Sequence, residues 1–210
     1  CLAKWEKGDR FEVVANPDYY RGKPFFERVV MLKVPEAGNR VVTLRSGQAG
    51  LIERVTPKQF NSLRGVRNVK VAGVVGNENL FVHMNYKTPP FDNIDLRKAI
   101  AYAIPYDAII RDAYFGDAKK WKGIIPSSYT DFHEPSTIYD ENLEKAKQFL
   151  AKAGYPDGKG LEQFKDAFNL SYITEKESQL GPVVTLIKSN LAKIGIDVQL
   201  DPMPQTQYGD

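Results

Sequence analysis

The clearest hydrophobic pattern lies at the C-terminal end of the chain. Residues 168–172 alternate between apolar and polar side chains, which predicts a β-strand. The next segment carries apolar residues at helical spacing up to Gly195, and residues 196–200 alternate again. A strand, a helix and a strand at this spacing predict a parallel strand pair joined by a right-handed crossover.

Further helices are predicted in the middle of the chain. One follows Asp92 or Asn93, either of which can cap it, and ends at Pro105, after which a second short helix begins. A strongly amphipathic helix follows, with a predicted cap at Asp140 and a stop at Gly154.

The N-terminal part is richer in β-branched and aromatic residues. It predicts strands within 11–20 and 25–35, followed by a helix within 36–46. More extended structure is predicted at 69–74 and, after an interruption rich in glycine and asparagine, at 80–86. Since helices and strands are interleaved, the chain is expected to be an α/β protein.

The predicted strand at 80–86 has two different faces. In an extended chain, alternate side chains point to opposite sides. One side then carries Leu80, Val82, Met84 and Tyr86, and the other carries Phe81, His83 and Asn85.

Composition narrows the class of protein. Of 210 residues, 42% are hydrophobic and 26% charged, which is an ordinary globular balance. The net charge of +3, from 29 basic and 26 acidic residues, is too even for an electrostatic nucleic-acid binder. No apolar run approaches the roughly 20 residues of a membrane span. The single cysteine excludes an internal disulfide framework and a cysteine-based zinc site.

The sequence does not indicate an enzyme. It has no glycine-rich phosphate-binding signature, and its two histidines, His83 and His133, lack a ligand-like spacing, so neither a metal site nor a catalytic group is predicted.

Three single residues allow both a binding and a structural interpretation. His83 is either a surface residue or a ligand contact. Trp121 lies among lysines and is either part of an anion or aromatic site or of a solvated loop. Glu175 follows a predicted strand, where α/β proteins place binding groups, and it equally suits the cap region of the next helix.

Residues 84–104 and several other stretches carry a recognisable pattern. The first combines Asn85, Pro89-Pro90-Phe91-Asp92, Arg97, Ala99 and Ala103. The others are NPDYYRGKPFFERVV at 16–30, LRSGQAG at 44–50, GDA…IIPSS at 116–128, YDENLEKAKQFLAKAGYPDG at 139–158 and LAKIGIDVQL at 191–200. In this order they resemble the bacterial extracellular solute-binding proteins of family 5, the dipeptide-, oligopeptide- and nickel-binding components of ABC transporters. A departure is Gly50, where family members usually carry an acidic residue.

The resemblance implies a periplasmic-binding-protein-like fold of type II, represented by part of the first lobe and most of the second. Residues 1–75 would belong to the first lobe and 76–210 to the second, with an interlobe crossing near 72–80. Because family members are much longer, we expect the chain to be a fragment of a larger precursor. Cys1 then aligns with a position in the middle of the longer family sequences, so lipidation of Cys1 is not expected.

The implied function is the capture of a small solute, most readily a di- or oligopeptide, and its delivery to a membrane permease. The protein is expected to be monomeric, without cofactor or nucleic acid, and periplasmic or extracellular, with a lipid anchor possible in the precursor. The alternatives are a non-peptide solute such as a nickel chelate, opine or oligosaccharide, or a signalling or chaperone-like binding protein.

The resemblance also suggests ligand-binding residues. Phe81 and His83 align with an aromatic and an acidic residue that contact ligand in oligopeptide-binding relatives, and the histidine is a departure that implies different ligand chemistry. Thr174 and Glu175 form a second group, and Trp121 is a third candidate. An aspartate that pairs with the peptide amine in relatives would lie beyond Asp210.

Overall fold

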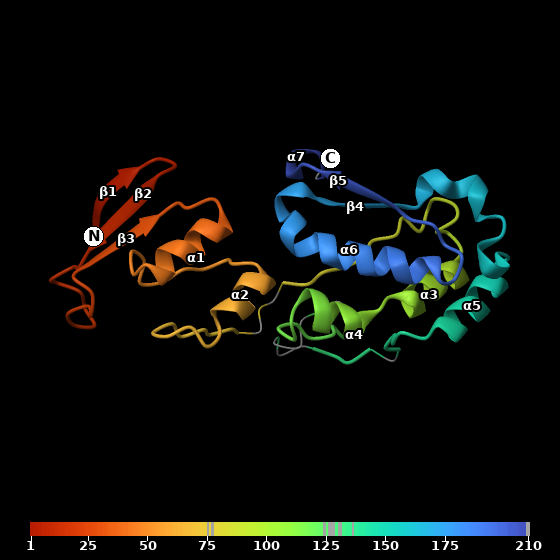
Figure 1. Ribbon diagram of the computed structural model, residues 1–210, viewed down its shortest axis with the longest axis horizontal. Coiled ribbons are helices and arrows are strands. Elements are labelled where there is room, and N and C mark those ends of the chain that lie inside the picture. The colour runs from red at the N-terminus through yellow and green to blue at the C-terminus, as the bar shows by residue number, and fades with distance from the viewer. Residues whose placement is uncertain are drawn as a thin grey trace. The chain divides into compact units, whose positions relative to one another are not determined.

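The computed structural model describes residues 1–74, 76, 78–123, 125, 129, 132–135 and 137–208. The chain forms two compact units, residues 1–55 and 56–210 (Figure 1). Within the described part, no helix combines the length and the apolar character needed to cross a membrane.

Residues 1–55 form a small antiparallel sheet with one helix. Strands β1 (Leu2–Glu6), β2 (Arg10–Val14) and β3 (Arg28–Leu32) pair in the order β1-β2-β3, and α1 spans Ala37–Arg45. The strands predicted within 11–20 and 25–35 and the helix predicted within 36–46 are therefore confirmed, whereas β1 was not predicted.

The sheet has one charged and one apolar face. Glu12 of β2 is buried and lies between Arg10 and Arg28, with N–O distances of 3.5 and 3.7 Å. On the opposite face Trp5, Phe11 and Met31 stand side by side in the strand register and remain exposed.

Residues 56–210 contain most of the helices and a parallel pair of strands. The helices are α2 (Pro57–Leu63), α3 (Ile94–Ala103), α4 (Tyr106–Ala108), the π-helix η1 (Ile109–Ala113), α5 (Leu143–Lys152), the 3₁₀ helices η2 (Pro156–Gly158), η3 (Leu161–Ala167) and η4 (Thr174–Lys176), α6 (Glu177–Ala192) and α7 (Gln205–Tyr208). Strands β4 (Asn169–Ile173) and β5 (Gln199–Met203) pair in parallel, which confirms the parallel pair predicted at this end of the chain. The second strand begins at Gln199 rather than at Ile196; Ile196 and Val198 precede the ladder and are buried in the core.

The predicted helix caps are partly confirmed. The Asn93 side-chain oxygen accepts from the backbone N–H groups of Asp95 and Leu96, so Asn93 caps α3. The cap of α5 is Asn142, not Asp140. The Asp140 carboxylate instead pairs with the ammonium group of Lys120, which removes it from the helix end.

The strands predicted at 69–74 and 80–86 are wrong. Neither segment joins a strand ladder in the part of the chain that the structure describes. A strand needs a partner for its backbone N–H and C=O groups, and alternation of side chains alone does not supply one. Residues 75 and 77 of the predicted crossing lie outside the described residues.

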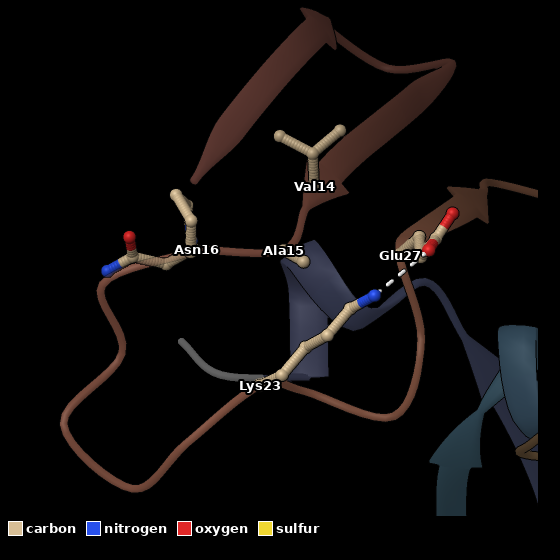
Figure 2. A pocket seen from close by; sticks show the side chains of 6 residues that line it. Val14, Ala15, Asn16, Lys23 and Glu27 are labelled. Carbon is tan, nitrogen blue, oxygen red and sulfur yellow. Dashed lines mark hydrogen bonds and ion pairs between the residues drawn. The ribbon is translucent and has the colours of Figure 1, made fainter.

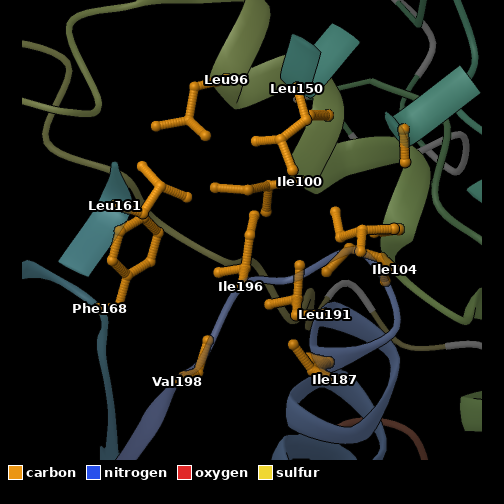
Figure 3. Close-up of a cluster of buried hydrophobic side chains, with 14 of the residues drawn as sticks. Leu96, Ile100, Ile104, Leu150, Leu161, Phe168, Ile187, Leu191, Ile196 and Val198 are labelled. Carbon is orange, nitrogen blue, oxygen red and sulfur yellow. The ribbon is translucent and has the colours of Figure 1, made fainter. Parts of the chain in front are cut away.

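The core of residues 56–210 lies where α6 packs against the strand pair and against α3, and where α3 packs against α5 (Figures 1 and 3). Figure 3 shows side chains from α3, α5 and α6, and from the residues just before β4 and β5, converging on one cluster, which includes Leu96, Ile100, Leu150, Phe168, Ile187, Leu191, Ile196 and Val198. Burying such side chains contributes about 1.5–3 kcal/mol each, so this cluster dominates the stability of the unit.

Two glycines let the chain close tightly around this core. Gly158 and Gly195 have positive φ angles of 80° and 84°, and their backbones touch. A Cβ atom on either residue would overlap the backbone of the facing turn, so glycine is required at both positions.

Asn190 is a buried polar residue in α6. Its side-chain amide nitrogen donates to the Ala103 carbonyl oxygen at 2.7 Å and to a Glu141 carboxylate oxygen at 2.8 Å. Its oxygen accepts from the Lys193 ammonium group at 2.6 Å. One side chain therefore connects α6 with the end of α3 and with the segment before α5.

We predict that Asn190→Ala lowers the free energy of unfolding by about 2–3 kcal/mol, because the buried Ala103 carbonyl loses its donor. The matched control is Asn169→Ala, which removes an amide-to-carbonyl hydrogen bond of 2.9 Å at an exposed position and should cost below about 1 kcal/mol. Urea unfolding followed by circular dichroism measures both, and equal losses for the two variants would contradict this role of Asn190.

Candidate functional site

Phe81 and His83 lie together on the segment before the Pro-Pro turn. Their ring centroids are 5.8 Å apart with an interplanar angle of 56°. Phe81 is 44% exposed, and His83 is exposed as well. Two adjacent rings that face solvent, in a segment that pairs with no strand among the residues described, form a surface that a ligand can contact.

The C-terminal end of this segment is firmly attached to the core. Met84 and Phe91 pack against the buried cluster, and the Phe91 ring meets Phe168 edge-on at 5.2 Å. The Arg97 guanidinium donates to the carbonyl oxygens of Phe91 and Asp92 at 2.6 and 3.1 Å. The turn and α3 thus fix the point from which Phe81 and His83 project.

Thr174 and Glu175 form the start of η4, directly after the carboxyl end of β4, and both are exposed. The Glu175 carboxylate accepts a hydrogen bond from the backbone N–H of Gln205, at 3.1 Å for the nearer oxygen, at the first residue of α7. Glu175 therefore contacts the start of α7. The sequence analysis had instead considered it for the start of the helix that directly follows the strand.

Trp121 is half-buried, and its indole N–H has no acceptor among the residues described. The lysines on either side are paired. Lys120 contacts Asp140 and lies 4.7 Å from the centroid of the Tyr106 ring, and Lys122 contacts Glu134 at 2.7 Å.

Burial changes the acid–base properties beside Trp121. Burial lowers the pKa of the Lys120 ammonium group; the charge of Asp107 opposes this shift, and the charge of Lys122 adds to it. Burial, together with Tyr139, raises the pKa of Tyr106 to about 12. Tyr106 therefore keeps its proton at neutral pH and is not tuned for proton transfer there.

The predicted residues form three groups. Phe81 and His83 touch each other, and Thr174 and Glu175 are neighbours, but no hydrogen bond, ion pair or ring contact joins these groups or Trp121 within the described part of the chain. Residues 124 and 126–128 of the 116–128 stretch lie outside the described residues, as does Asp210.

One polar atom near this segment was missed by the sequence analysis. The Asn79 side-chain oxygen is buried and has no hydrogen-bond partner among the described residues. The sequence showed Asn79 only as part of a turn-rich interruption, and no pattern marks an unpaired atom.

A separate hollow lies in residues 1–55, at the loop between β2 and β3 (Figure 2). It encloses about 340 Å³ and is lined by Val14, Ala15, Asn16, Pro17, Lys23 and Glu27. Figure 2 shows the Lys23 ammonium group directed at Glu27, 3.3 Å away. Both side chains are largely exposed, so this pair contributes little. None of the predicted binding residues lines this open hollow.

No set of three or more histidine, cysteine, aspartate or glutamate side chains is placed to hold a metal ion within the described residues. The features that can bind a ligand are therefore exposed rings, unpaired polar atoms and side chains at a strand end.

Comparison with known proteins places this arrangement in a family. The model of "Bacterial extracellular solute-binding proteins, family 5 Middle" matches residues 1–210. The chain is 29% identical to "Heme-binding protein A" of Haemophilus influenzae over 187 residues, which cover 88% of this chain and 33% of that protein. It is 24% identical to the "Probable D,D-dipeptide-binding periplasmic protein DdpA" of Escherichia coli over 210 residues, covering 100% of this chain and 39% of that protein.

A solved structure supports the same relationship. The ABC transporter-associated periplasmic binding protein DppA from Helicobacter pylori, in complex with the peptide STSA, is 26% identical and superposes with a TM-score of 0.71 over 99% of this chain and 38% of that one. The chain thus spans between a third and two fifths of the length of these relatives, which are named as binding proteins rather than enzymes. Its α/β fold is that of a fragment of a type II periplasmic binding protein. Since the family model matches the whole chain, the chain belongs to the bacterial extracellular solute-binding proteins, family 5.

Proposed function

We propose that the protein containing this chain is the solute-binding component of an ABC importer, with a di- or oligopeptide as its ligand. The observation that carries this proposal is the family match over the whole chain. The likeness to the H. pylori protein, whose structure contains a peptide, supports the choice of ligand. The protein acts as a carrier rather than an enzyme, and it works outside the cytoplasmic membrane. A lipid anchor on the precursor is compatible with this role.

Ligand capture would occur by closure of two lobes about a hinge. Residues 1–75 belong to the first lobe and 76–210 to the second in this proposal, with the crossing near 72–80. The closed, monomeric protein then binds the membrane permease, and nucleic acid plays no part. A peptide suits such a cleft because backbone donors and acceptors can bind many sequences when the side-chain pockets are wet.

The residues proposed to contact the ligand are Phe81, His83, Thr174, Glu175 and Trp121. Phe81 offers an apolar ring, and the His83 imidazole can donate to a carboxylate. The Trp121 indole N–H is a donor without an acceptor among the described residues. Glu175 supplies a carboxylate close to the end of β4, although it already accepts from Gln205.

A second candidate is a non-peptide solute, specifically a haem. The relative from H. influenzae is named a heme-binding protein, and His83 presents an exposed imidazole, a common ligand of haem iron. Haem would contact the same side of the segment 80–86, the side that carries Phe81 and His83.

Isothermal titration calorimetry tests the ligand class on the protein expressed from its complete gene. The panel contains trialanine, the peptide STSA, nickel-EDTA, haemin and maltotriose. We expect a peptide to bind with a dissociation constant of about 10 μM or below, that is about −7 kcal/mol or stronger. Binding of haemin alone would replace the peptide by the second candidate, and binding of none would contradict solute capture.

A second test concerns the residues. Phe81→Ala and His83→Ala should each weaken binding of the bound peptide by about tenfold, equivalent to about 1.4 kcal/mol, with little change in melting temperature because both side chains are exposed. The control is Ile94→Ala, which removes a side chain that is 55% exposed and belongs to α3. Unchanged affinity in both variants would remove Phe81 and His83 from the site.

A further inference from the structure

A patch of lysines and aromatic rings lies where α3 and α5 pack together (Figure 1). Lys98 and Tyr102 are four residues apart in α3, and Lys145 and Phe149 are four residues apart in α5, so each pair shares one side of its helix. The Tyr102 and Phe149 rings stack across the two helices, with centroids 5.6 Å apart and an interplanar angle of 11°. The rings therefore form one platform that neither helix has alone.

Lys98 and Lys145 each lie over a ring of the other helix. The Lys98 ammonium nitrogen is 5.5 Å from the centroid of the Phe149 ring, and the Lys145 nitrogen is 5.4 Å from that of Tyr102. The nitrogen of Lys152 in α5 lies 5.9 Å from the Phe149 centroid. The three lysines and two rings are called the α3–α5 patch below.

The positive charge of this patch is only partly neutralised. Lys152 is paired with Asp95, at an N–O distance of 3.1 Å. Among the described residues, Lys98 and Lys145 make their ring contacts but no ion pair with a carboxylate. Two like charges held over adjacent rings repel each other, and a carboxylate on a partner would relieve this repulsion. The patch thus has the charge and the apolar area of a contact for an acidic partner.

We propose that the α3–α5 patch docks on an acidic surface of the membrane permease. This inference rests on the proposed function, which requires the loaded protein to bind a permease, and it adds the place and the charge of that contact. Complementary charge steers a partner and fixes its orientation, and aromatic rings are enriched in protein interfaces. None of the residues proposed to contact the ligand belongs to the patch, so capture and docking can be measured separately.

The charge of the patch favours a protein partner over the lipid surface. Recognition of anionic lipid headgroups is typical of clusters of about four to eight basic residues. The α3–α5 patch has fewer, and one of its lysines is already paired with Asp95. A permease can instead place single carboxylates opposite Lys98 and Lys145.

A purely structural patch would use the lysine stems to cover the rings, because methylene groups can do this without any charge. The double variant Lys98→Met/Lys145→Met keeps apolar stems and removes both charges, whereas Lys98→Arg/Lys145→Arg keeps both charges. Docking should therefore be slower in the first variant and retained in the second. A structural role would leave docking unchanged in both.

The experiment uses the protein expressed from its complete gene and loaded with the peptide STSA. Surface plasmon resonance measures its association with the permease of the same transporter, held in nanodiscs of phosphatidylcholine. At about 50 mM salt, Lys98→Glu/Lys145→Glu should associate about tenfold more slowly than wild type, and the methionine variant about threefold more slowly. Both differences should shrink at about 1 M salt, because salt screens exposed charges.

The matched control is Lys159→Glu/Lys165→Glu. It makes the same change in net charge at two exposed lysines that contact no ring, so it should associate as wild type does. Calorimetry with the peptide STSA and differential scanning calorimetry should give wild-type affinity and nearly wild-type melting temperatures for every variant. If the glutamate variant melts early, the folded methionine variant decides, and a wild-type association rate in it overturns the inference.

The outcomes separate docking from capture. If wild type binds the permease and the patch variants associate equally fast, the docking role is wrong and the proposed function stands. Equal slowing in the control would show that net charge alone matters and would overturn the inference too. Binding of wild type to empty nanodiscs of phosphatidylglycerol, lost in the glutamate variant, would assign the patch to lipid instead. If loaded wild type does not bind the permease, the proposed function and this inference both fail.

Discussion

The hydrogen bond from the buried Asn190 amide to the Ala103 carbonyl is the interaction on which the arrangement of residues 56–210 depends. It satisfies a carbonyl at the end of α3 that has no partner within its own helix, and the same amide reaches Glu141 before α5. Hydrophobic burial supplies most of the stability, but it is non-directional. The directional bond fixes where α3 ends against α6, and the core cluster then fills the space between them.

This anchoring has a consequence for the candidate site. Because α3 is fixed at its end by Asn190 and at its start by the Asn93 cap, the turn before it is fixed too, and Arg97 holds the carbonyls of that turn. Phe81 and His83 therefore project from a rigid base while their own segment has no strand partner in the described part of the chain. Preorganisation reduces the cost of binding, and this fixed base supports the proposal that the two rings contact the ligand.

The sequence predicted those parts whose causes are local. Apolar spacing located α5, α6 and β4, and the residue preference at helix starts narrowed the cap of α3 to Asp92 or Asn93, of which the structure selects Asn93. The strands expected at 69–74 and 80–86 failed because pairing depends on a partner elsewhere, which alternation does not reveal. The cap of α5 was placed at Asp140 because the sequence does not show that Lys120 binds it. For the site, family resemblance pointed to Phe81 and His83, but the unpaired oxygen of Asn79 is a property of three-dimensional packing alone.

The central claim is that the ligand meets the surface formed by the Phe81 and His83 rings, and not the open hollow beside Lys23. Hydrogen–deuterium exchange of the protein expressed from its complete gene, with and without saturating peptide STSA, tests it most directly. We predict slower exchange of the backbone amides of residues 78–84 on binding, because bound ligand and closure restrict solvent access there. Protection confined to residues 15–27, with no change at 78–84, would contradict the account.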